Sequence, residues 1–107
     1  LLRVPELATE KGDMISIPIE VKRSGNNEAK TGLNAQLIDR YMSQLGTDTG
    51  VYVVVWLDAP ELPRSHSPVW PSKEAAKKDL EQQVSSVIAS SDGSIRIAAI
   101  FVDASLV

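Results

Sequence analysis

The chain has 107 residues, of which 43% are hydrophobic and 23% charged, and its net charge is −3. This length and composition predict a single folded domain over residues 1–107 and argue against a disordered chain. The absence of cysteine excludes disulfides, zinc–thiolate sites and thiol catalysis, and no apolar run approaches the roughly 20 residues of a membrane span, so no membrane partner is expected. The acidic balance disfavours an unaided nucleic-acid binder but leaves a nuclease open, because a bound cation restores positive potential locally.

The first two predicted elements are strands, residues 1–7 and 14–23, joined by a polar turn. The second strand contains the clearest alternation in the chain. One face carries Ile15, Ile17, Ile19 and Val21, and the other carries Ser16, Pro18, Glu20 and Lys22. Together the two strands predict an antiparallel hairpin. Because the chain opens within an apolar stretch and does not begin with Met, we expect a fragment of a larger protein that has other domains.

A helix is predicted next, from about residue 28 to residue 45, followed by a strand over residues 51–57. The helix has apolar residues at helical spacing, and Gly46 provides a stop signal. The strand is a continuous β-branched and aromatic run, which is typical of a central strand that is buried on both faces and paired in parallel. Trp56, within this run, is expected in the core.

The remaining predicted elements are a Pro-rich loop over residues 58–72, a helix from about 73 to 90 and a strand over 95–102. Ser72 is placed to cap the helix. Trp70 is expected to anchor the loop, and His66, the single histidine, is interpreted as a loop residue. The order β-β-α-β-α-β predicts an α/β fold with a mixed β-sheet, in which an antiparallel hairpin joins parallel strands and helices flank the sheet.

Glu20 and Lys22 are the most informative pair of polar residues in the chain. Side chains alternate across a strand, so both project from one face, one pleat apart. A carboxylate and an ammonium held in this way can share one divalent metal, one water and one phosphate, as in a metal-dependent phosphodiesterase. A second Glu-x-Lys, Glu28-Ala29-Lys30, falls at the predicted helix start, where residues two apart do not face each other. Strand context therefore selects the first pair.

Three segments carry a resemblance to a known family: Ile19-Glu20-Val21-Lys22, a helix with Gln36-Leu37 and Tyr41, and the strand from Gly50 to Trp56. They resemble the PD-(D/E)XK nucleases, the restriction-endonuclease-like family, and above all bacterial members with Glu-x-Lys on a strand and Gln-Leu-x-x-x-Tyr on the next helix. The motifs cover residues 1–57, and beyond residue 73 only the order of elements fits.

The resemblance implies a three-layer nuclease core that hydrolyses phosphodiester bonds with Mg²⁺ or Mn²⁺. It implies DNA as the substrate, a cytoplasmic bacterial protein, and a role in restriction, phage defence or repair. Oligomeric state stays open, although a homodimer is typical of such nucleases when they cut two strands.

The resemblance also implies roles for particular residues. Glu20 would ligate the metal together with the backbone carbonyl of Val21. Lys22 would orient the attacking water and stabilise charge on the phosphate, and Gln36 would lie beside the site. The candidates for contacts with the nucleic-acid backbone are Arg23, Lys30 and Arg40.

One acid of the family pattern is missing from the expected place. Asp13 is the only aspartate before Glu20, and seven residues of strand place it roughly 23 Å away, too far to share an ion. Glu6 would lie roughly 10 Å away along the hairpin by the same measure. We expect the missing aspartate at, or just before, Leu1 in the parent sequence.

Two alternatives to an active nuclease remain. The first is a catalytically inactive nuclease-like domain used for nucleic-acid or protein binding, which the missing aspartate and the acidic charge favour. The second is an unrelated α/β interaction module, in which Glu20 and Lys22 form an ordinary solvated ion pair of small energetic effect.

Overall fold

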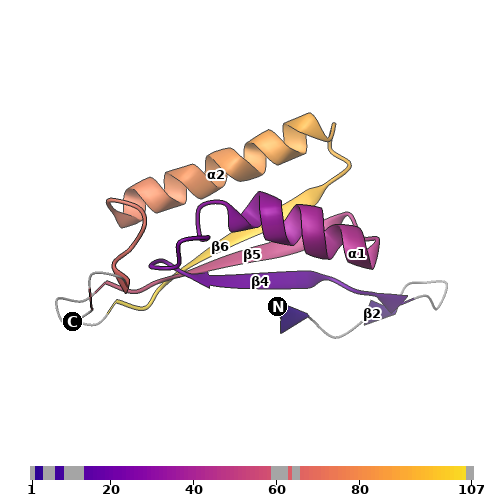
Figure 1. Ribbon diagram of the computed structural model, residues 1–107. Helices are drawn as coiled ribbons and strands as arrows, with labels where there is room; N and C mark the ends of the chain where they lie inside the picture. The colour runs from indigo at the N-terminus through magenta and orange to yellow at the C-terminus, as the bar shows by residue number, and fades with distance from the viewer. Residues whose placement is uncertain (1, 4–6, 9–13, 59–62, 64–65, 106–107) are drawn as a thin grey trace.

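The computed structural model describes residues 2–3, 7–8, 14–58, 63 and 66–105. Its centre is a sheet of three long parallel strands, β4 (Pro18–Arg23), β5 (Thr49–Trp56) and β6 (Arg96–Asp103), with β5 in the middle. Helical segments connect them, so the order over these elements is β-α-β-α-β, as the sequence predicts for this part of the chain (Figure 1). The chain is therefore an α/β domain.

Both helical crossovers lie on the same face of the sheet (Figure 1). This follows from the strand order, because successive crossovers of one hand that step in one direction place their helices on one side. The helix-facing side chains of β5 alternate with the others and form the centre of the core. Tyr52, Val54 and Trp56 are buried there, and so are Leu33 and Leu37 from the first helix and Leu80 from the second.

The first helix is shorter than predicted, and most of it is a π-helix. It consists of a π-helical segment, η1 (Leu33–Met42), that continues into one turn of α-helix, α1 (Ser43–Leu45). Its buried residues Leu33, Leu37 and Met42 are spaced by four and then five positions, which suits the wider turn of a π-helix. Gly46, with φ of 64°, ends the helix as expected. Residues 28–31, predicted as its first turn, form turns instead.

The second helix, α2 (Lys73–Ser90), has the predicted bounds. The Ser72 hydroxyl accepts a hydrogen bond of 3.1 Å from the Ala75 amide, which confirms the cap. Trp70 is buried and its indole N–H donates to Asp79 of α2 at 2.8 Å, so it does anchor the Pro-rich loop. Within the described residues, no helix is both long and apolar enough to cross a membrane.

The continuous antiparallel hairpin predicted over residues 1–23 is wrong. The antiparallel pairing that is described consists of two ladders of two residues each, β1 (Leu2–Arg3) on β4 and β2 (Leu7–Ala8) on β3 (Met14–Ile15). Three residues separate the ladders on one side and two on the other, so one uninterrupted register cannot join them. Pro18, which cannot donate a ladder hydrogen bond, lies at the break. Its partner is Arg3.

The face of the sheet opposite the helices is mainly apolar. Parallel register aligns its side chains in three rows, Ile19, Val51 and Ala98; Val21, Val53 and Ile100; Arg23, Val55 and Val102, and in a polar row of Thr49 and Arg96 at the amino ends of β5 and β6. The described elements thus form two layers, a sheet and a layer of helices, and the third layer implied by the family resemblance is not among them.

Candidate functional site

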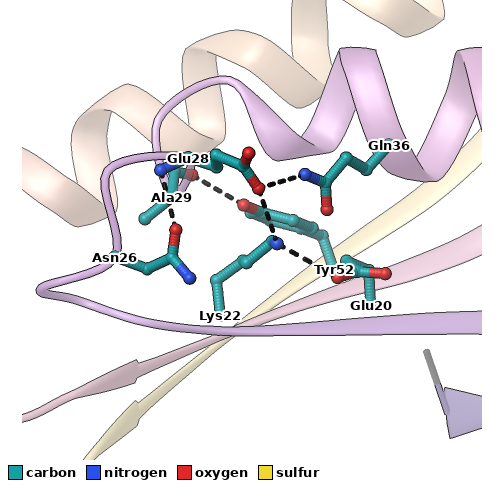
Figure 2. Close-up of polar contacts among 7 residues, drawn as sticks. All are labelled: Glu20, Lys22, Asn26, Glu28, Ala29, Gln36 and Tyr52. Carbon is teal, nitrogen blue, oxygen red and sulfur yellow. Dashed lines mark hydrogen bonds and ion pairs between the residues drawn. The ribbon is translucent and has the colours of Figure 1, made fainter.

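The predicted pair Glu20 and Lys22 lies on the helix-covered face of β4. The parallel register sets Glu20 beside Tyr52 and Lys22 beside Val54, both of which are core residues of β5. The ammonium of Lys22 lies 3.4 Å from Glu20 Oε1 (Figure 2). The Glu20 side chain is only 7% exposed and the Lys22 side chain only 11%, so the pair is largely removed from water. It is therefore not the solvated ion pair that was expected for an unrelated α/β interaction module.

The second carboxylate oxygen of Glu20 lacks a hydrogen-bond donor among the described residues. Glu20 Oε2 is buried, and no described residue donates a hydrogen bond to it. Burying a carboxylate oxygen without a partner is unfavourable, and such an atom in a folded protein usually marks the place of a water, an ion or a ligand. This orphaned oxygen distinguishes Glu20 from a carboxylate whose only role is an ion pair.

Glu28 joins the pair from the other side of Lys22. Its Oε2 lies 3.3 Å from Lys22 Nζ, and the side-chain amide of Gln36 donates to the same oxygen (Figure 2). These contacts hold the pKa of Glu28 below its ordinary value, first through the Gln36 hydrogen bond and then through Lys22. The structure therefore brings three predicted site residues, Glu20, Lys22 and Gln36, into one cluster with Glu28.

Glu28 is not among the predicted site residues, because a helix was expected to begin there. The helix begins at Leu33, and Glu28 lies in a turn from which its side chain points back to β4. The available signal was Asn26, whose side-chain oxygen accepts from the Glu28 amide at 2.8 Å, a turn that asparagine favours.

Tyr52 is the second residue that the sequence interpretation missed. Its hydroxyl is buried and donates to the carbonyl of Ala29 at 2.7 Å, which ties the turn carrying Glu28 to β5. Burial raises the pKa of Tyr52, and the charges of Glu20 and Glu28 raise it further, so the hydroxyl remains a donor. The signal was its place as the only hydroxyl in an otherwise apolar run from Val51 to Leu57.

The residues predicted to contact nucleic acid lie outside the cluster of Glu20, Lys22, Glu28 and Gln36. Strand alternation puts Arg23 on the open face beside Val55, and Lys30 is exposed in the turn. Arg40 is exposed and lies over the ring of Tyr41, 5.4 Å from its centroid. Among the described residues, no hydrogen bond or ion pair links these three cations to the Glu20–Lys22–Glu28–Gln36 cluster.

Metal-binding capacity in the described part of the chain is limited. No three histidine, cysteine, aspartate or glutamate residues there are grouped to hold an ion. Glu20 supplies one hard oxygen, and the neighbouring carboxylate, Glu28, already accepts from two donors. Val21, the predicted carbonyl ligand, directs its side chain to the open face and is 37% exposed. Glu6 and Asp13, which were weighed as further ligands, lie outside the described residues.

Fold and site together define a parallel α/β domain with a buried acid–amine pair under its helix layer. A family model described as Domain of unknown function (DUF8371) matches residues 6–59, just over half of the chain, and the chain belongs to this family. The match contains every member of the cluster, from Glu20 to Tyr52. No curated protein and no solved structure matches the chain.

Proposed function

We propose that this domain is part of a metal-dependent nuclease with the three-layer, restriction-endonuclease-like fold, and that it hydrolyses phosphodiester bonds of DNA. The observation that carries the proposal is the Glu20–Lys22 pair, held on one strand face at 3.4 Å with Glu20 Oε2 buried and without a partner. Gln36, on the helix that follows, reaches the same cluster through Glu28.

The residues present fit one part of a Mg²⁺ or Mn²⁺ site. Glu20 Oε2 is a hard oxygen in need of a partner, which is the ligand type these ions prefer, and the Val21 carbonyl is a second candidate. When bound, such an ion polarises a phosphodiester and lowers the pKa of a coordinated water. The ammonium of Lys22 is placed to donate a hydrogen bond to that water or to a phosphate oxygen as negative charge develops. Further ligands would come from water, substrate or residues outside those described.

From the resemblance to PD-(D/E)XK nucleases we further propose that the domain belongs to a larger multidomain protein of restriction, phage defence or repair in the bacterial cytoplasm. A homodimer would supply two active sites for double-strand cleavage.

A second candidate function is nucleic-acid or protein binding by a nuclease-like domain that does not cleave. One observation favours it: among the described residues, no second acid completes a metal site beside Glu20, and Glu28 engages both Lys22 and Gln36.

Cleavage of supercoiled plasmid DNA by the full-length protein with Mg²⁺ or Mn²⁺ separates these functions. We expect Glu20→Gln and Lys22→Met each to reduce cleavage by about a hundredfold or more. Glu81→Gln and Lys78→Met change the same charges on the exposed face of α2 and should cleave like the wild type. Circular dichroism of all four variants controls for folding.

Cleavage that persists in both site variants would place the chemistry elsewhere. A wild-type protein that binds DNA in a salt-sensitive manner without cutting it would support the second function instead.

A further inference from the structure

The carboxylate of Glu28 occupies a point on which two hydrogen-bond donors converge. Lys22 Nζ reaches Glu28 Oε2 from β4 at 3.3 Å, and Gln36 Nε2 donates to the same oxygen from η1 (Figure 2). An ammonium and an amide N–H can only donate, so the point between them suits an anionic oxygen and not a cation. Glu28 supplies that oxygen from within the chain.

The backbone of Glu28 is fixed while its carboxylate is exposed. The Asn26 side chain accepts from the Glu28 amide at 2.8 Å, and Tyr52 donates to the next carbonyl, that of Ala29, at 2.7 Å. In contrast, the Glu28 side chain is 60% exposed. Rotating it into water would break only exposed interactions, which are individually weak, and would leave the two donors in place.

An open cavity adjoins this position. It has a volume of about 410 Å³, lies at the carboxyl end of β4, and is lined by Arg23, Gly25, Asn26, Asn27, Glu28 and His66. Ligands of open α/β sheets commonly bind beyond the carboxyl ends of the strands. Glu28 lines this cavity and its two donors, Lys22 and Gln36, do not, so an anion that enters there meets the Glu28 carboxylate before it reaches the donors.

We propose that Glu28 is an internal, displaceable anion that holds the position of a substrate phosphate oxygen between Lys22 and Gln36. A phosphate group entering from the cavity displaces the Glu28 carboxylate into water and takes over both donors. Glu28 thereby lowers the affinity of the resting site for anions. The identity of the anion as a phosphodiester rests on the proposed function, whereas the anion site itself rests on the two converging donors.

The competing role for Glu28 is that of a metal ligand that replaces the missing aspartate. The two roles predict opposite effects for Glu28→Gln. Neutralising an internal competitor strengthens anion binding, because the Gln amide oxygen competes more weakly than a carboxylate for Lys22 and Gln36 and one negative charge is lost. Removal of a metal ligand weakens Mn²⁺ binding and leaves anion affinity unchanged.

The test measures binding of inorganic phosphate and of a short 5′-phosphorylated DNA oligonucleotide to the full-length protein in EDTA at fixed ionic strength. Glu28→Gln should bind both about fivefold more tightly, the upper range for release of an exposed ion pair. Glu81→Gln makes the same change in net charge on an exposed part of α2 and should shift affinity less than twofold. The gain should disappear in Lys22→Met/Glu28→Gln, because the released donor is then absent.

Equal affinities for Glu28→Gln and Glu81→Gln would overturn the proposal, and so would weaker Mn²⁺ binding by Glu28→Gln with unchanged phosphate affinity. A gain in phosphate affinity without cleavage in any variant would keep the anion site and refute the nuclease. Cleavage without the gain would do the reverse.

Discussion

Lys22 is the central charge of the cluster, because its ammonium lies within ion-pair distance of two carboxylates. Glu20 Oε1 lies 3.4 Å from it and Glu28 Oε2 lies 3.3 Å from it, one largely buried and the other exposed. The trio has a net charge of −1, so it does not attract a phosphate as a whole. When the Glu28 carboxylate moves away, Glu20 and Lys22 remain as a neutral pair and Lys22 has a free donor. The exposed acid, Glu28, can therefore control whether Lys22 is available to an anion.

The lowered pKa of Glu28 gives a test of this arrangement at the level of one residue. Because its pKa lies below the ordinary value of 4.5, its contacts stabilise the fold above pH 4.5 and are lost as the pH falls through the lowered pKa. Gln36 is the largest cause of the shift, so in Gln36→Ala the pKa of Glu28 should rise toward 4.5.

Carboxyl NMR titration of both proteins measures this change. A Glu28 pKa that does not move in Gln36→Ala would contradict the hydrogen bond.

At the scale of elements, the turn before η1 is set by its contact with β5. A Cβ placed on Gly32 would lie 2.6 Å from the Tyr52 hydroxyl oxygen, so the start of the helix approaches the strand more closely than a side chain at this position would permit. The same hydroxyl donates to the carbonyl of Ala29 within the turn. This hydrogen bond ties the turn that carries Glu28 to β5.

We expect Gly32→Ala to destabilise the fold by about 1–3 kcal/mol through overpacking against Tyr52. Tyr52→Phe should lose about 1–2 kcal/mol, because the buried carbonyl of Ala29 loses its donor. The double variant should be less destabilised than the sum, since removal of the hydroxyl makes room for the new methyl group. Urea unfolding of the four proteins gives the coupling energy, and strict additivity would contradict this packing.

At the scale of the whole molecule, the helices cover one face of the sheet and leave the other apolar. On that open face, Val21, Ile100 and Val102 are 37%, 47% and 42% exposed. All-parallel sheets are almost always covered on both faces, so this surface is the least typical feature of the described fold.

Substitution of Ile100 by threonine should change the free energy of unfolding by less than about 0.5 kcal/mol, because the side chain is half exposed. The same change should lower the binding of a hydrophobic dye, since it interrupts the middle row of the apolar face. Ile97→Thr, a buried position on the other face of β6, is the matched control and should be clearly destabilising. Strong destabilisation by Ile100→Thr would show that the open face is covered.

The sequence by itself determined the features that depend on neighbouring residues. The alternation around Glu20 and Lys22 placed both side chains on one face, the β-branched run identified the central parallel strand, and Ser72 and Gly46 marked helix ends. Each of these signals lies within a few residues of its consequence, so backbone geometry alone is enough to interpret it. Gln36 also reached the cluster, although through Glu28.

Only the tertiary structure decided where the helix begins, how the amino-terminal strands pair, and which acid approaches Lys22. The turn at Glu28 is held by a hydrogen bond between Tyr52 and Ala29, 23 residues apart in the chain. The break in the predicted hairpin arises because the two segments that connect the ladders differ in length by one residue. Both result from packing between distant segments, which local propensity cannot encode. For that reason Glu28, which was set aside because a helix was expected there, contacts Lys22 and Gln36.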